Sequence, residues 1–117
     1  MAGVMQAEAG NSDEELTAMA WLIRNRLVSG RFDEMLSIGD ILIGFNSVNT
    51  KNNGISIEVD NKKYYVSSPT EKAKEIAEKV LKGEIENPIG DRCYKTNNQD
   101  EISENDEPIK IGKNIYY

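Results

Sequence analysis

Histidine is missing from the 117 residues of this chain, and cysteine occurs once, as Cys93. Structural zinc sites usually need four Cys or His ligands and catalytic zinc sites usually need His, which argues against a zinc amidase or peptidase. A Ser-His or Cys-His nucleophile cannot be assembled without His, and one thiol cannot build the disulfide framework of a small secreted domain. Carboxylate, hydroxyl, amide and lysine groups remain for chemistry, and we expect no metal ion and no organic cofactor.

Long apolar runs are also missing, so we expect no insertion into a membrane. The formal net charge is −6 and the pI is about 4.7, which argues against nucleic acid because phosphate binding requires clustered Lys and Arg. The length predicts a single domain over residues 1–117, with one modest core, and we expect a monomer.

The first residues, MAGVMQAEAG, lack the basic segment of a secretion signal. The domain therefore acts in the cytoplasm, is delivered by something else, or has lost an upstream part. A helix of about eight residues at a chain terminus is marginal alone. This favours a domain excised from a longer protein, in which delivery or targeting domains are expected.

Apolar residues that recur at three- and four-residue steps, together with stop signals, predict four helices: 2–9, 13–29, 33–42 and 70–82. Ser12 and Glu15 have the spacing of a capping box at the start of the second helix. Gly39 weakens the third helix.

One β-hairpin is predicted over 55–67, because apolar and polar residues alternate there and Asp60-Asn61-Lys62 can turn the chain. Beyond Glu84 the chain is expected to be mostly irregular, with an apolar end that packs back on the body. The pattern as a whole predicts a mainly helical α+β fold with a short hairpin.

Several short stretches follow one another in a recognisable order: Ala7-Glu8-Ala9, Asn25-Arg26, IGFNSVN at 43–49, VLKGEIENPIGDRCY at 80–94 and IGKNIYY at 111–117. This order resembles the spore-cortex-lytic type of bacterial cell wall hydrolases, in the lysozyme-like superfamily. In that family an acidic residue within Ala-Glu-Ala ends the first helix, and Asn-Arg ends the second. The resemblance implies a lysozyme-like fold and cleavage of the glycan strand of peptidoglycan, at the cell wall and outside the cytoplasm.

Three features depart from the family's pattern. Asn114 stands where the family usually has His, and Asn46 stands where it usually has Gln. The hairpin at 55–66 looks like an insertion. The two substitutions lie in candidate substrate contacts, so they bear on sugar or peptide preference more than on the reaction.

Glu8 is the residue to which the resemblance gives catalysis. Breaking a glycosidic bond requires protonation of a poor leaving oxygen, which a carboxylic acid in an apolar setting can supply. Trp21 and Phe45 are candidates for the apolar wall. The alternative is that Glu8 is a solvated helix residue, as most glutamates are.

The second carboxylate is left open by the sequence. A hydrolase pairs its acid with a nucleophile or a base, whereas a lytic transglycosylase uses one glutamate and the sugar's own 6-hydroxyl group. The resemblance favours the transglycosylase. Candidates for a second carboxylate, each of which can equally be a cap or a surface charge, are Asp13, Glu14, Asp40 and Asp91.

Six further residues are candidate substrate contacts: Phe45, Asn46, Ser47, Tyr94, Asn114 and Tyr116. Each aromatic ring among them can instead belong to the core, and loop Asn and Ser side chains usually cap turns. We expect Glu8, the 45–47 segment and Tyr94 to lie around one concave surface. We also expect Cys93 to be a small buried apolar residue and Arg26 to make a salt bridge or carbonyl contact at a helix end.

Two rival functions use the same residues differently. One is an inactive, glycan-binding structural domain of an envelope, phage-tail or secretion assembly. The other is an injected antibacterial effector domain, which shares the chemistry and has an immunity partner.

Overall fold

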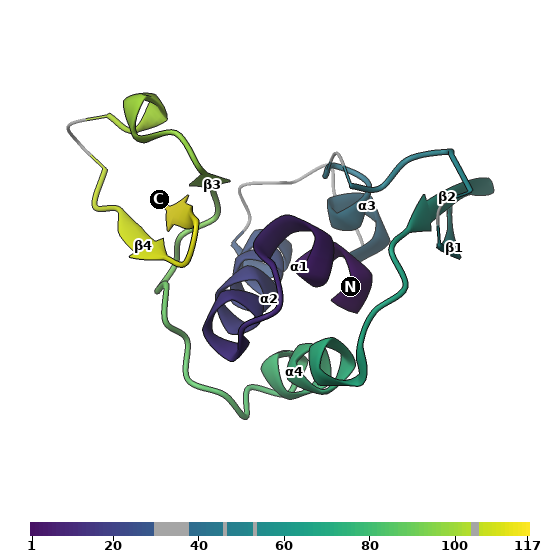
Figure 1. Ribbon diagram of the computed structural model, residues 1–117, viewed down its shortest axis with the longest axis horizontal. Coiled ribbons are helices and arrows are strands. Elements are labelled where there is room, and N and C mark those ends of the chain that lie inside the picture. Colours follow the sequence, from purple (N-terminus) through teal and green to yellow (C-terminus); the bar gives the residue numbers. More distant parts are fainter. Residues whose placement is uncertain (30–37, 46, 53, 104–105) are drawn as a thin grey trace.

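A computed structural model describes residues 1–29, 38–45, 47–52, 54–103 and 106–117. Within these residues the chain forms an α+β domain with two small antiparallel sheets (Figure 1). The helices are α1 (Ala2–Ala9), α2 (Asp13–Val28), α3 (Ile38–Leu42), α4 (Glu71–Leu81) and the 3₁₀ helix η1 (Gln99–Glu101). The strands are β1 (Ile55–Val59), β2 (Lys62–Val66), β3 (Lys95–Thr96), β4 (Ile109–Ile111) and β5 (Asn114–Tyr116).

Helix α2 is the centre of the core, and α1, α3 and α4 all pack against it. Six consecutive residues, 18–23, are buried, so the middle of this helix is surrounded by the other elements instead of burying one face. Leu22 and Ile23 are completely buried, and Met5 of α1 and Val80 of α4 are completely buried as well. Truncation of a core leucine such as Leu22 to alanine typically costs about 2–5 kcal/mol.

Side-chain caps fix where the two long helices begin. The Ser12 hydroxyl group accepts a hydrogen bond from the Glu15 amide at 3.1 Å, and the Thr70 hydroxyl group accepts one from the Ala73 amide at 3.2 Å. The Gln6 side chain of α1 accepts a bond from the Thr70 amide at 2.9 Å, which ties α1 to the start of α4. The predicted helices are confirmed with ends within one residue, except that the predicted start of α3 lies outside the described residues.

The predicted hairpin is confirmed as β1–β2. Val59 and Lys62 are paired across a two-residue turn, and both turn residues have positive φ, 53° for Asp60 and 67° for Asn61. Short polar side chains tolerate this conformation, and a turn with two positive φ values matches the twist of the flanking strands.

The C-terminal segment differs from the prediction, because it forms a three-stranded sheet in the order β3–β5–β4 where irregular chain was expected. Strands of two and three residues are too short to show an alternating pattern. The β4–β5 turn contains Gly112 at φ 60°, and a methyl group there would overlap the Glu15 carboxylate of α2. Figure 1 shows the two sheets at opposite ends of the longest axis, with the helices between them.

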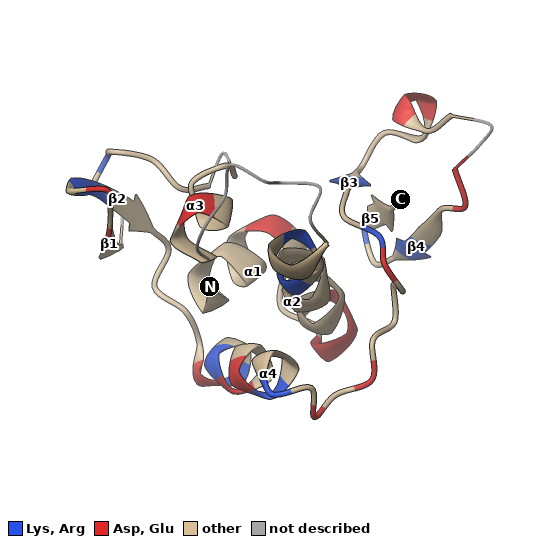
Figure 2. Cartoon of the chain, turned by 180° about the vertical axis from the view of Figure 1, so that it is seen from behind, with Lys and Arg blue, Asp and Glu red and all other residues tan. Residues whose placement is uncertain are grey.

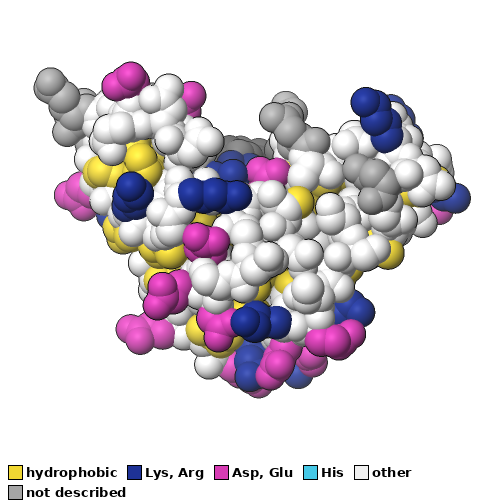
Figure 3. All heavy atoms as spheres, in the orientation of Figure 1, with side chains coloured by type: hydrophobic (Ala, Val, Ile, Leu, Met, Phe, Trp, Pro, Cys, Tyr) yellow, Lys and Arg dark blue, Asp and Glu magenta, His cyan; other side chains and the backbone are white. Residues whose placement is uncertain are grey.

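Charged residues are concentrated on the outer face of α4. Lys74, Lys79 and Lys82 each pair with a glutamate three or four positions earlier. Acidic and basic residues are mixed along α4 in Figure 2, and Figure 3 shows both signs along the lower edge of the molecule, over α4. Of the helices that the structure describes, none combines the length and the apolarity needed to cross a membrane.

Candidate functional site

Glu8 lies in the last turn of α1, at a cavity of about 250 Å³. Its carboxylate oxygen is 3.1 Å from the ammonium nitrogen of Lys95 in β3, and each of the two side chains is only 16% exposed. The other residues that line the cavity are Arg26 of α2 and, after α3, Gly44 and Phe45. Glu8 is therefore not a solvated helix residue, because its carboxylate is largely withdrawn from water.

Asn114 holds the main chain behind Glu8. Its side-chain nitrogen donates a hydrogen bond to the Glu8 carbonyl oxygen at 3.1 Å, and Asn114 is only 3% exposed. The last carbonyl groups of a helix lack partners inside the helix. The amide of Asn114 therefore satisfies one of them and links α1 to the C-terminal sheet.

Arg26 of α2 lines the cavity and is opposite in charge to Glu8. Its Nε donates a hydrogen bond to the Cys93 carbonyl oxygen at 2.7 Å, which confirms the predicted carbonyl contact at a helix end. The guanidinium carbon lies 4.8 Å from the ring centre of Phe45 and 5.8 Å from that of Tyr94. Burial lowers the pKa of Arg26 from its ordinary value, and nearby acidic groups offset part of this effect. Arginine nevertheless stays charged in proteins.

Asn25 fixes the segment that leads into β3. Its side-chain nitrogen donates hydrogen bonds to the carbonyl oxygens of Gly90 and Arg92, both at 2.8 Å. Cys93, which follows, is completely buried, as expected for a small apolar residue. The adjacent side chains of Asn25 and Arg26 thus bind three carbonyl groups within residues 90–93, directly before Tyr94 and Lys95.

No family model, curated protein or solved structure matches this chain. The function therefore has to be inferred from the residues and from the geometry of the cavity.

The structure brings some of the predicted site residues together and not others. Glu8 and Phe45 line one cavity, and Tyr94 lies beside it with 40% of its surface exposed. Ser47 and Trp21 are not among the residues that line it. Asn46 lies outside the described residues.

Two of the predicted substrate contacts have buried positions. Asn114 donates to the Glu8 main chain, which is a positioning contact. Tyr116 is completely buried, so its ring closes the core, which is the alternative that the sequence left open. Substrate contact by Tyr116 is not possible in this conformation. All three residues of β5 are buried, and β5 is the central strand of its sheet.

Lys95 was missed by the sequence reasoning. It directly follows the 80–94 segment, but nothing distinguishes it in the sequence from the other lysines of this chain. Its pairing with Glu8 depends on a strand of two residues, β3, which the sequence does not predict. The expected apolar wall is consequently incomplete, because Phe45 supplies apolar surface while Lys95 and Arg26 supply positive charge.

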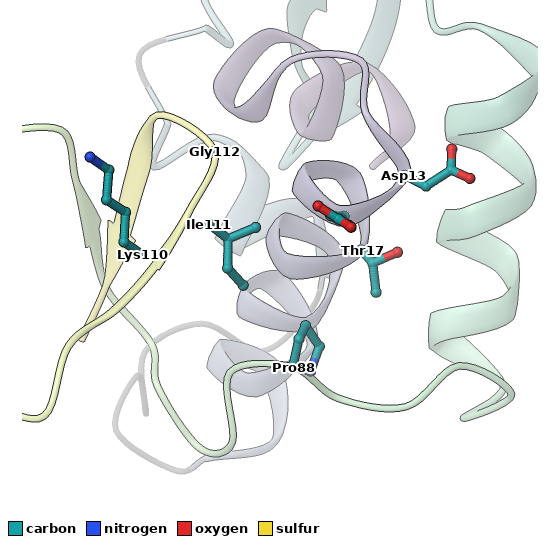
Figure 4. A pocket seen from close by; sticks show the side chains of 7 residues that line it. Asp13, Thr17, Pro88, Lys110, Ile111 and Gly112 are labelled. Atoms are coloured by element: carbon teal, nitrogen blue, oxygen red, sulfur yellow. The ribbon is translucent and has the colours of Figure 1, made fainter.

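No second carboxylate accompanies Glu8 among the described residues that line this cavity. Asp13 and Glu14 line a different one, of about 440 Å³, between the first turn of α2 and the β4–β5 turn (Figure 4). Across the described part of the chain, no group of three or more Cys, Asp and Glu side chains could hold a metal ion.

Among the described residues, cavities larger than the one at Glu8 include that of about 440 Å³ and one of about 540 Å³ between α2 and α4. The second contains the ion pair between Lys72 and Asp13, whose side chains are 56% and 74% exposed. Charges so exposed to water interact weakly. The smaller cavity is the better candidate, because its ion pair is shielded and its residues come from four separate parts of the chain.

Proposed function

We propose that this chain is a peptidoglycan-cleaving domain with a lysozyme-like fold, which cuts the glycan strand with Glu8 as general acid and base. One observation carries the proposal. Segments that resemble the cell wall hydrolases, far apart in sequence, meet at one cavity: Glu8, Arg26 and Phe45 line it, and Asn114 supports Glu8 from behind.

The cavity chemistry supports a single-glutamate reaction. Protonated Glu8 gives its proton to the glycosidic oxygen as the bond from that oxygen to the sugar C1 breaks. The 6-hydroxyl oxygen of the same sugar then attacks C1, and its proton returns to the Glu8 carboxylate. Lys95 and Arg26 stabilise the carboxylate between these two steps. The bridge to Lys95 opens before the reaction, as the substrate enters and Glu8 takes up its proton.

A lytic transglycosylase is favoured over a hydrolase, because Glu8 is the one carboxylate among the described residues that line the cavity. The product distinguishes the two mechanisms. Mass spectrometry of purified peptidoglycan after incubation detects a 1,6-anhydro end, which is one water lighter than a reducing end. A reducing end would instead require a second carboxylate near Glu8.

Glu8→Gln tests the catalytic role. The amide keeps the size of the side chain and can still accept a hydrogen bond from Lys95, but it has no carboxylic proton. We expect activity to fall by about 10²–10⁴-fold or more, with little change in melting temperature. Glu14→Gln, in the other cavity, is the matched control and should keep full activity. Full activity in Glu8→Gln would remove the proposal.

A glycan-binding domain without catalysis is the second candidate. The observation in its favour is the shielded ion pair between Glu8 and Lys95, since a structural salt bridge has the same geometry. A folded wild-type domain that binds peptidoglycan and releases no fragment would support this candidate. In both cases we propose that the domain acts at the bacterial cell wall, outside the cytoplasm.

A further inference from the structure

Tyr94 and Tyr117 form a stacked pair of rings beside the Glu8 cavity. Their ring centres are 5.7 Å apart and the ring planes are inclined by 27°. Tyr94 is one of the few large apolar side chains with considerable exposure, at 40%, and Tyr117 is partly exposed. Single exposed aromatic rings are common on protein surfaces, whereas a stacked pair of rings next to a cavity is a candidate binding surface.

Main-chain hydrogen bonds hold the pair in register. The Tyr94 amide donates to the Tyr117 carbonyl oxygen at 3.1 Å, and the Tyr117 amide donates to the Tyr94 carbonyl oxygen at 2.9 Å. This exchange extends the β3–β5 ladder, in which Lys95 pairs with Tyr116. Tyr116 is completely buried, whereas Tyr117, the next residue, is partly exposed. The two rings are therefore placed before any ligand arrives, which lowers the entropic cost of binding.

Two further planar groups, the guanidinium group of Arg26 and the ring of Phe45, lie between this pair and the cavity. The Arg26 guanidinium carbon lies 5.8 Å from the ring centre of Tyr94 and 4.8 Å from that of Phe45. Phe45 and Arg26 line the cavity together with Glu8. Arg26 thus contacts both the ring of Phe45 at the cavity and the ring of Tyr94 in the stacked pair.

We propose that the Tyr94 and Tyr117 rings bind a pyranose ring of the glycan strand, next to the sugar whose bond lies at Glu8. The C–H face of a pyranose is flat and apolar, and its hydroxyl groups lie at the edge. A tyrosine offers the complementary surface, an apolar ring face with a hydroxyl group at its tip. This inference takes its ligand class from the proposed function, but binding requires no cleavage.

The test uses the complete chain with Glu8→Gln, so that the ligand is not consumed. The probe is a soluble glycan strand of alternating N-acetylglucosamine and N-acetylmuramic acid without stem peptides, and the dissociation constant is measured by calorimetry. Tyr94→Leu and Tyr117→Leu keep apolar bulk but lose the flat ring, and each should weaken binding by about tenfold. Tyr94→Phe and Tyr117→Phe keep the ring and should bind within about threefold of the parent.

Tyr65→Leu is the matched control, because Tyr65 is a partly exposed tyrosine on the β1–β2 hairpin at the other end of the molecule. It should leave binding unchanged. Melting temperatures establish whether each variant is folded. If a Leu variant does not fold, the Phe variants still test whether the aromatic ring without its hydroxyl group is sufficient for binding. Absence of binding by the parent at millimolar glycan, equal binding by folded Leu variants, or lost binding in the Phe variants would overturn the inference.

The outcome separates this inference from catalysis. Glycan binding that depends on the two tyrosine rings, without any cleavage by the wild-type chain, would confirm the sugar-binding role of Tyr94 and Tyr117 and reject the proposed enzyme. Cleavage by the wild-type chain, with the same KM in Tyr94→Leu and Tyr117→Leu, would support the proposed enzyme and reject the sugar-binding role of the two tyrosines.

Discussion

At the scale of single residues, Asn114 and Tyr116 of β5 make different contacts. The Asn114 amide reaches the Glu8 carbonyl oxygen across 106 positions of sequence, while the Tyr116 ring fills the core. The first contact fixes the main chain at Glu8, and the second supplies apolar burial. Both depend on the same three-residue strand, so the site and the core are stabilised together.

Tyr116 gives a pH prediction. Burial of the phenol group raises its pKa to about 12, and the neighbouring Asn114 side chain offsets part of the rise. An unfolded chain releases this proton near the ordinary pKa of 10.0, so between pH 10 and 12 the folded state holds more proton. The free energy of unfolding is therefore unaffected below pH 10 and falls as pH rises through this window, by about 2–3 kcal/mol.

Urea unfolding of the wild-type chain and of Tyr116→Phe, at intervals from pH 8 to 12, measures this effect. The difference between the two proteins isolates one phenol group from all other groups that titrate there. We expect the wild-type chain to lose more stability than Tyr116→Phe above about pH 10. Parallel curves over the whole range would show that Tyr116 does not titrate differently in the two states.

At the scale of elements, the last turns of α2 organise the segment before β3. Asn25 is 8% exposed, and its side-chain nitrogen donates to two main-chain carbonyl groups. Asn25→Ala would leave both groups with one partner fewer, at a cost of about 1–3 kcal/mol. Asn25→Asp keeps the shape but directs a carboxylate at two carbonyl oxygens, so we expect it to be at least as destabilising.

Chemical denaturation measures the loss of stability, and peptidoglycan cleavage measures its consequence at the site. Because Asn25 binds the segment directly before Tyr94 and Lys95, activity should fall in both variants even at a temperature where they remain folded. Asn97→Ala, at an exposed position, should change stability by less than about 0.5 kcal/mol. If Asn25→Ala were as stable and as active as Asn97→Ala, these hydrogen bonds would not organise the segment.

The elements that the sequence predicts well are those with long patterns or strong local signals. Helices α2 and α4 have several turns of apolar periodicity and a capping side chain each, and the β1–β2 hairpin has its turn residues. Strands β3, β4 and β5 have two or three residues each, too few for a pattern. Their pairing is non-local, and it determines the buried position of Tyr116.

The candidate site was predictable from the sequence to a similar extent. Glu8 and Phe45 followed from the order of segments, whereas Lys95 depends on strand pairing that no local signal reveals. Asn114 was expected to contact substrate, and the structure shows its side chain donating to the Glu8 carbonyl oxygen, a contact that the sequence does not reveal.

At the scale of the whole molecule, local and overall charge have opposite signs. The cavity holds Arg26 and Lys95 against the single carboxylate of Glu8, whereas the chain carries a formal net charge of −6. Peptidoglycan is anionic through its peptide carboxylates. If peptidoglycan is the substrate, as we propose, long-range repulsion opposes the approach to an intact wall, and short-range attraction operates only once the strand is in the cavity.

Ionic strength should separate these two effects. Between about 0.01 M and 0.15 M salt, the distance over which exposed charges interact falls from about 30 Å to about 8 Å. The repulsion is screened first, because it acts over the longer distance, so we expect the initial rate of cleavage of intact sacculi to rise over this range. A basic lysozyme attracted to the wall would show the opposite dependence.

Charge variants provide the control for this salt dependence. Glu58→Gln and Glu86→Gln each remove one negative charge at exposed positions that do not line the Glu8 cavity. Together they should raise the rate at low salt and flatten the dependence, without changing the rate at 0.15 M. A rate that falls with added salt in the wild-type chain would mean that the cationic cavity, and not the net charge, governs the encounter with the wall.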